Sequence, residues 1–196
     1  MENKTNSKKK LGLRQVVVAG MLSSISIVLG LTGYGFIALP TIKATILHIP
    51  VVIGAIVEGP VVGALIGLIF GLFSIFQNMI NPGVLSFAFY NPMVSVLPRV
   101  LIGIVSYYTY KLIRVKSHAL RIGIGAATGT ITNTVGVLSM IYIFYAARYA
   151  EINGVTVNSA AKLIFGIAIV QGIPEIIIAV LVTIPAALAL KAIKKR

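Results

Sequence analysis

Six stretches of the chain are apolar, and this pattern constrains the fold more than any other feature: five have about the length of a membrane-spanning helix or more, and the second is short, about 20 Å, so we expect it to begin below the outer membrane interface. They cover residues 13–33, 45–57, 60–79, 93–114, 120–146 and 160–192. A helix needs about 20 apolar residues to cross the hydrocarbon core of a bilayer. Charged residues make up only 11% of the chain, against about a quarter in soluble domains. The sequence therefore predicts an all-α integral membrane protein with six transmembrane helices.

The positions of the basic residues predict how these helices are oriented. The net charge of +13 could suggest a nucleic-acid partner, but the positions of the basic residues argue against it. If the chain crosses the membrane six times, the two termini and the connection between the fourth and fifth segments lie on the same side. These three places hold 13 of the 17 Lys and Arg residues: Lys4, Lys8, Lys9, Lys10, Arg14, Lys111, Arg114, Lys116, Arg121, Lys191, Lys194, Lys195 and Arg196. The positive-inside rule then places both termini in the cytoplasm. We expect a basic cytoplasmic tail over residues 1–12, a single transmembrane domain over 13–196, a bilayer as partner, and no nucleic acid.

The sequence contains none of the common motifs that indicate an enzyme active site. It has no Cys, two His, no nucleophile elbow and no pair of histidines around a glutamate. A Gly-rich phosphate loop ending in Lys-Ser or Lys-Thr is also missing, so we expect neither a cofactor nor an ATPase site of its own. Any primary source of energy would have to come from a partner.

Two ionisable residues lie well inside apolar stretches, namely Arg99 and Glu175. A charge at membrane depth is costly unless it faces protein or water and has a partner, so such residues indicate a functional site. Polar residues at helical spacing accompany them on the last three predicted helices: Ser95, Arg99 and Ser106; Thr130, Asn133 and Thr134; Gln171 and Glu175. We expect these three stripes to converge in the outer half of the membrane.

The predicted outer loops, near residues 34–45 and 80–92, add further polar side chains above this region. Together they suggest a pocket that opens outward and suits a small solute with amide, hydroxyl and carboxylate groups, because Arg supplies a charged fork and Asn and Gln both donate and accept. The predicted substrate-binding residues are Arg99, Asn133, Gln171, Glu175, Asn78, Tyr90, Asn91, Lys43 and Thr130.

Two structural alternatives stay open. Arg99 and Glu175 could pair with each other and fix the fourth predicted helix against the sixth. The glycines at 59, 63, 67 and 71 leave four missing side chains on one face of a helix, which favours close packing within the chain and could also serve a docking partner.

Several motifs, in order, resemble the S components of energy-coupling-factor (ECF) vitamin transporters. They are Lys43–Pro60 with His48-Ile49-Pro50 and Glu58-Gly59-Pro60, the glycines through Gly71, Pro98-Arg99, Gly129-Thr130-Ile131-Thr132-Asn133-Thr134, and Gln171-Gly172-Ile173-Pro174-Glu175. The resemblance spans nearly the whole chain, and no single motif carries it.

The resemblance implies a membrane subunit that captures a vitamin outside and works with a membrane-embedded T component and two cytoplasmic ATPases. In that family an alanine pair four residues apart on the first helix contacts the T component. The corresponding residues are Ala19 and Ser23, and Ser23 departs from the alanine. The family's site lies on its fourth to sixth helices and the outer loops, where the polar stripes were found.

The pattern most resembles the pantothenate branch, which implies that Arg99 pairs with the ligand carboxylate while Asn133 and Gln171 bind the rest. Folate, riboflavin, pyridoxine or a pyrimidine precursor remain alternative ligands. The predicted location is the plasma membrane of a bacterium. One rival class is a self-sufficient secondary transporter with Arg99 and Glu175 as an ion relay, although no inverted repeat is visible. Another is an intramembrane enzyme using Glu175 and His48.

Overall fold

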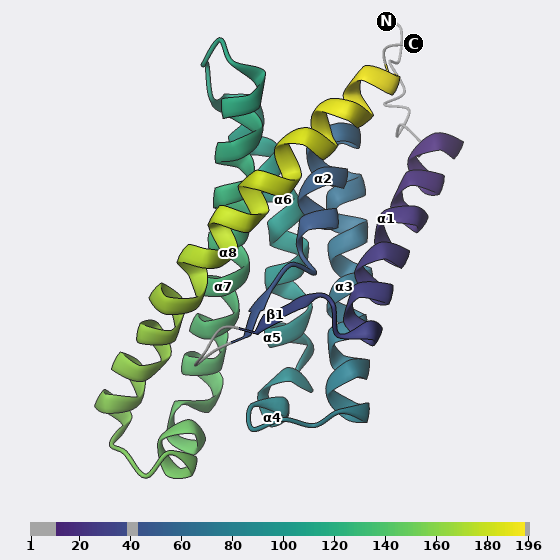
Figure 1. Cartoon of the computed structure of the whole chain (residues 1–196). Coiled ribbons are helices and arrows are strands. Elements are labelled where there is room, and N and C mark those ends of the chain that lie inside the picture. The colour runs from purple at the N-terminus through teal and green to yellow at the C-terminus, as the bar shows by residue number, and fades with distance from the viewer. Residues whose placement is uncertain (1–10, 39–42, 195–196) are drawn as a thin grey trace, which may run out of the picture.

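The computed structural model describes residues 11–38 and 43–194, and almost all of this part of the chain is helical (Figure 1). The elements in chain order are α1 (Leu13–Thr32), β1 (Phe36–Ala38), β2 (Lys43–Thr45), α2 (Ile49–Glu58), α3 (Pro60–Ile80), α4 (Ser86–Phe89), α5 (Pro92–Ser95), α6 (Leu97–Leu112), α7 (His118–Ile152) and α8 (Val157–Lys194).

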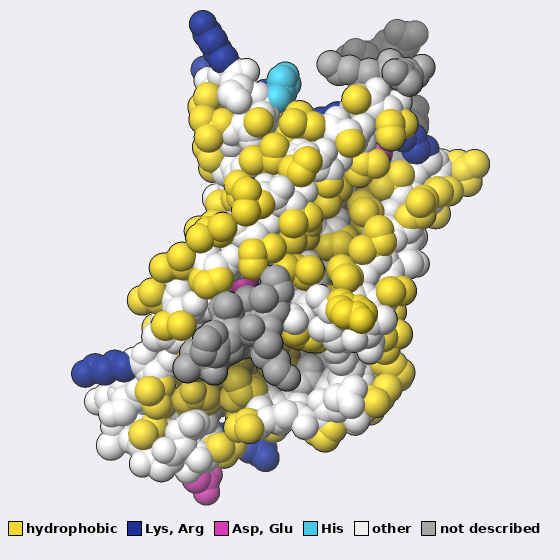
Figure 2. All heavy atoms as spheres, viewed as in Figure 1, with side chains coloured by type: hydrophobic (Ala, Val, Ile, Leu, Met, Phe, Trp, Pro, Cys, Tyr) yellow, Lys and Arg dark blue, Asp and Glu magenta, His cyan; other side chains and the backbone are white. Residues whose placement is uncertain are grey.

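Five segments are long and apolar enough to cross a membrane: Leu13–Thr32, Pro60–Ile80, Pro92–Leu112, His118–Ile152 and Val157–Lys194. Hydrophobic side chains cover the middle of the face shown in Figure 2, and Lys and Arg side chains lie toward its ends. The predicted integral membrane bundle is thus confirmed. The second predicted segment, 45–57, is the exception, because its helix α2 has only 10 residues.

Helix α2 lies at the centre of the bundle. All ten of its residues are buried, and it packs against α1, α3, α6, α7 and α8. It begins at Ile49, where Pro50 in the first turn suits a helix start because proline already lacks the backbone N–H that would be unpaired there. Strand β2 and a turn at Leu47 and His48 precede it, so the helical part of this segment is limited to these ten residues.

A short antiparallel hairpin replaces part of the loop expected over residues 34–45. Strand β1 pairs with β2 in the register Phe36↔Thr45, Ile37↔Ala44 and Ala38↔Lys43. Gly33 ends α1 with a φ of 78°, a left-handed conformation that glycine adopts without strain. This hairpin is the one departure from the predicted all-α fold among the described residues.

The glycine face of α3 packs within the chain, against α6. A Cβ on Gly63 would meet Ala55 and Gly103, one on Gly67 would meet the backbone carbonyl of Arg99, and one on Gly71 would meet Val96. Helices separated only by backbone atoms can approach this closely because no side chain stands between them. The packing interpretation of the glycines at 63, 67 and 71 is therefore confirmed.

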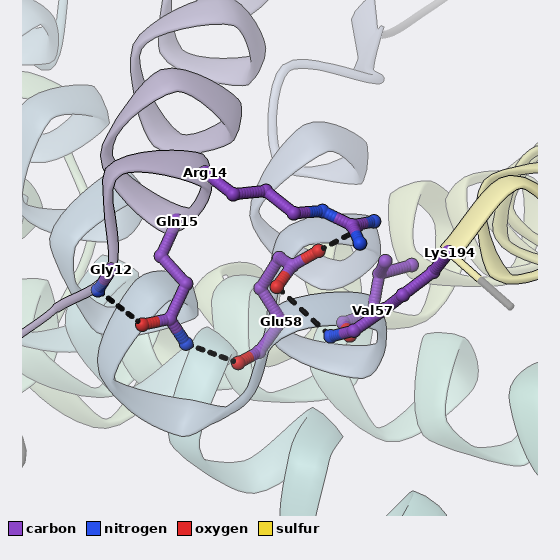
Figure 3. Close-up of polar contacts among 6 residues, drawn as sticks. All are labelled: Gly12, Arg14, Gln15, Val57, Glu58 and Lys194. Carbon is purple, nitrogen blue, oxygen red and sulfur yellow. Dashed lines mark hydrogen bonds and ion pairs between the residues drawn. The ribbon is translucent and has the colours of Figure 1, made fainter. Parts of the chain in front are cut away.

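The start of α1, the α2–α3 turn and the end of α8 meet at one end of the bundle (Figures 1 and 3). The Glu58 carboxylate accepts from Lys194 Nζ at 2.9 Å and forms an ion pair with Arg14 Nη2 at 3.3 Å. Lys194 also donates to the Val57 carbonyl, and the Gln15 side-chain amide donates to the Glu58 carbonyl. The buried Glu58 carboxylate thus holds α1 and α8 to the turn between α2 and α3.

We expect Glu58→Gln to lower stability by about 1 kcal/mol, or roughly 2–4 °C in the apparent melting temperature. The amide carries no charge for Arg14 and Lys194, although both cations stay partly solvated and so lose only part of their partner. Thermal unfolding in detergent measures the effect. The matched control is Glu151→Gln, because Glu151 is exposed and has no ion pair in the described chain. Equal melting temperatures for the two variants would contradict the fastening role.

Gly103→Ala should destabilise the bundle by about 1–3 kcal/mol, the usual range for overpacking. The new methyl group would collide with the backbone of Gly63 and Ala64, which cannot move aside as a flexible side chain could. Gly166→Ala on α8 is the control, since nothing lies within 4 Å of the position of its Cβ. Comparable melting temperatures for these two alanine variants would show that α3 and α6 are not in close contact.

Candidate functional site

Two adjoining cavities, of about 250 and 410 Å³, lie between the hairpin and the long helices. They share five lining residues: Thr45, Phe89, Arg99, Asn133 and Gln171. We call the smaller cavity the apolar lobe because it is also lined by Leu85, Val137, Leu138, Ile141 and Ile167. The larger is the polar lobe, lined also by Ser74, Gln77, Asn78 and Asn81.

Arg99 stands at the junction of the two lobes. It lies in the first turn of α6, is 6% exposed, and donates from Nη1 to the Val94 carbonyl at 2.9 Å. Its guanidinium carbon lies 5.6 Å from the centre of the Phe70 ring and 5.5 Å from that of Phe89, within cation–π range. Its Nε has no hydrogen-bond partner in the described part of the chain. Arg99 therefore offers the cavity a buried positive charge with a spare donor.

Glu175 lines the apolar lobe, but its carboxyl group is occupied by neighbours. Oε1 accepts from the Thr45 backbone N–H at 2.7 Å and from the Gln171 amide at 3.2 Å, and Oε2 accepts from the Thr134 hydroxyl at 2.8 Å. Arg99 and Glu175 form no ion pair within 4.0 Å; in residues 11–38 and 43–194 both ion pairs involve Glu58. The alternative of a direct Arg99–Glu175 ion pair, left open by the sequence, is therefore absent from this structure.

Asn133 is the second residue with spare hydrogen-bonding capacity. It lies on α7, is buried, and lines both lobes. Its Oδ1 has no partner among the residues that the structure describes. A buried acceptor without a partner carries a desolvation penalty that a ligand hydroxyl or amide N–H would relieve. Gln171 lies across the cavity on α8 and also lines both lobes.

The predicted residues of the outer loop mainly hold that loop in place. Asn78 donates to the Ser74 carbonyl and accepts from the Ser86 hydroxyl, although it also lines the polar lobe. Tyr90 is 45% exposed, donates to the Asn78 carbonyl and lines neither lobe. Asn91 lines neither lobe and caps α5, its side chain accepting from the Met93 N–H. Lys43 lies in β2, and its side chain is outside the described part of the structure.

Thr130 is separated from both lobes. Its hydroxyl lies 2.9 Å from His48 Nε2 and donates to the Ala126 carbonyl at 3.0 Å. His48 and Thr130 are both fully buried, so this pair joins the start of α2 to the middle of α7. Thr130 lines neither lobe in this structure, and these bonds give it a structural role.

The polar lobe is also lined by three residues of α3 that were not predicted as ligand contacts, namely Phe70, Ser74 and Gln77. With Asn81, just after the helix, they recur at spacings of three or four residues, and Gln77 donates to the Gly30 carbonyl at 2.9 Å. This spacing could have predicted that these residues line the same cavity, because residues three and four apart lie on one face of a helix. Thr45 carried no such signal, because its contribution to the network comes from its backbone N–H.

The predicted partner-docking residues face inward. Ala19 is 2% exposed and belongs to the core, and Ser23 is 4% exposed. Their exposed neighbours one position along the helix are Gly20 and Ser24. Ala19 and Ser23 thus set how α1 packs on the bundle, and the small residues on its outer surface are the adjacent pair.

Thr130→Val should lower the apparent melting temperature without altering ligand affinity. The change leaves His48 Nε2 buried without its partner, which costs about 1–3 kcal/mol. Thr183→Val is the matched control, because the Thr183 hydroxyl is equally buried and has no partner in the described chain. If Thr130→Val left the melting temperature unchanged but weakened ligand affinity, the result would contradict the structural role and indicate that Thr130 contacts the ligand.

Comparison with known proteins identifies the family. Residues 14–187 match the family model described as "ECF transporter, substrate-specific component". The chain is 33% identical to the Pantothenic acid transporter PanT of Lactococcus lactis subsp. cremoris, over 72% of this chain and 74% of that protein. It is 31% identical to the Pantothenate transporter PanT of Leuconostoc mesenteroides, over 69% of each. This multi-pass membrane protein therefore belongs to the ECF transporter family of substrate-specific components, a class of transport subunits and not of enzymes.

Proposed function

We propose that the chain captures pantothenate as the substrate-binding subunit of an ECF-type importer. The observation that carries this proposal is the Arg99 guanidinium, buried where the two lobes join and with its Nε unpartnered among the described residues. A buried cation favours an anionic ligand, and the planar fork of Arg matches a carboxylate. The names of the two PanT relatives support pantothenate as that anion.

The two lobes suit the two kinds of group in pantothenate. Its carboxylate pairs with Arg99, while its amide and hydroxyl groups bind Asn133 and Gln171 across the junction. Its two methyl groups then lie in the apolar lobe against Val137 and Ile141. A mostly apolar pocket with a few polar groups that fix orientation is typical of small-molecule sites.

We propose six spans with both termini in the cytoplasm of a bacterial cell. The five long segments supply five crossings, and α2 completes the sixth together with the extended chain before it. The end of the bundle where α1 begins and α8 ends carries Arg14 and Lys194, as the positive-inside rule requires of the cytoplasmic side. The cavity lies in the half of the bundle away from this end, and in this orientation it opens to the outside of the cell.

The family implies that this subunit works with a membrane-embedded T component and two cytoplasmic ATPases, which supply the energy of uptake. We place the docking surface on α1, as the resemblance implies. Ala19 and Ser23 position this helix from the inside, and Gly20 and Ser24 present small residues to the partner. Small residues allow a second helix to approach closely within a membrane.

The direct test of the proposed function is a ligand panel on the purified chain in detergent. A ligand at 100 times its Kd should stabilise the folded state by about 2.7 kcal/mol, which raises the apparent melting temperature. We expect a rise with pantothenate and none with riboflavin, folate or pyridoxine. A rise with another vitamin would replace the substrate and keep the class. Uptake by vesicles that lack any ATPase would instead favour a secondary transporter.

Arg99→Ala should weaken pantothenate binding by about 30-fold or more, because truncating one partner of a buried charge pair costs roughly 2–5 kcal/mol. Titration calorimetry measures the change, and Arg99→Lys shows how much depends on the charge alone. Arg148→Ala is the control, since Arg148 is exposed and lies over the Phe87 ring outside both lobes. A folded Arg99→Ala protein with unchanged affinity would refute the assignment of Arg99.

A further inference from the structure

Glu175 sits where three elements meet at the wall of the cavity. The residue belongs to α8, its Oε2 accepts from Thr134 on α7, and its Oε1 accepts from the backbone N–H of Thr45 in β2. The side chain is 1% exposed. One carboxyl group thus connects two membrane-spanning helices to the hairpin.

The neighbours of Glu175 leave it little capacity for a ligand. Its two oxygens already accept from the Thr45 backbone N–H, the Thr134 hydroxyl and the Gln171 amide. A carboxylate has about four acceptor sites, so three donors from the protein leave one at most for a ligand. A carboxylate would also repel the carboxylate of an anionic ligand, whereas Arg99 attracts it.

Strand β2 depends on this contact for its position. The hairpin has three residues per strand, and a two-stranded ribbon of that length is marginally stable by itself. Among the helices, α8 provides the main packing surface for β2. The Thr45 N–H is directed to Glu175 and not to β1, so this bond adds a link that strand pairing does not provide.

Thr45 lines both lobes, so its position shapes the ligand site. We infer that Glu175 is a positioning residue: it holds β2 against α8, completes the cavity wall at Thr45, and leaves ligand recognition to Arg99 and Asn133. This inference rests on the proposed function for its effect on pantothenate. Its structural part concerns the ligand-free protein alone.

Hydrogen–deuterium exchange of the ligand-free protein, read by mass spectrometry over residues 43–47, tests the inference. In Glu175→Ala we expect exchange over this segment to speed up about tenfold or more, the change that loss of a charge-assisted hydrogen bond of roughly 1.5–3 kcal/mol produces. Pantothenate should dissociate about tenfold faster from the same variant. Glu175→Gln keeps an oxygen that can accept from the Thr45 N–H but loses the charge, so its exchange should lie between that of the wild type and that of Glu175→Ala.

Two further variants separate local positioning from general destabilisation. Thr183→Val replaces another buried polar side chain of α8 and should leave exchange over residues 43–47 unchanged. Thr45→Pro removes the N–H donor while Glu175 stays intact, so it should loosen the neighbouring amides as Glu175→Ala does. This variant also decides the matter if Glu175→Ala does not fold.

Wild-type exchange over residues 43–47 in both Glu175→Ala and Thr45→Pro would overturn the inference. Weaker pantothenate binding by Glu175→Ala with undisturbed exchange would likewise overturn it and make Glu175 a direct ligand contact. If the wild type binds no pantothenate, the proposed function fails by itself, and the exchange measurements still decide whether Glu175 holds β2.

Discussion

The close contact between α3 and α6 determines where the Arg99 guanidinium lies. Gly67 rests on the Arg99 carbonyl and Gly71 on Val96, so the backbone of α6 is fixed at the turn that carries the arginine. Phe70 and Phe89 then flank the side chain, and the Val94 carbonyl takes one of its donors. A charge buried without a carboxylate within ion-pair distance in the described chain is costly by itself. Under the proposed function, the carboxylate of the ligand supplies the negative charge that this guanidinium lacks.

The short central helix α2 leaves space for the two cavities. A longer helix at this position would extend into the half of the bundle that holds the cavities, whereas α2 begins only at Ile49. The hairpin occupies part of the remaining space, and Phe36, Thr45 and Leu47 form one side of the polar lobe. The His48–Thr130 hydrogen bond and the bond from the Ser26 hydroxyl to the Leu47 carbonyl hold the start of α2 at this depth. At the other end of α2, the Glu58 carboxylate forms ion pairs with Arg14 and Lys194.

The helices were predictable from the sequence because apolar length and glycine spacing directly reflect membrane crossing and helix packing. Arg99, Asn133, Gln171 and Glu175 were also predicted to converge, since helical spacing places each on a defined face, and all four line the cavity. The role of each residue within the site was harder to predict from the sequence. That Glu175 is occupied and Asn133 has a spare acceptor depends on side-chain partners distant in sequence, such as Thr45, which contributes only a backbone N–H. The three-residue strands were likewise too short to show a periodicity.

The most direct test of the central claim compares two ligands on the wild-type protein by titration calorimetry. One is pantothenate, and the other is its alcohol analogue panthenol, in which the carboxylate is replaced by a neutral hydroxymethyl group. If a ligand carboxylate completes the buried Arg99 site, pantothenate should bind at least about 30-fold more tightly than the alcohol, because an unpaired buried cation costs roughly 2–5 kcal/mol. Equal affinities for the two would contradict the account, since the rest of both molecules is identical.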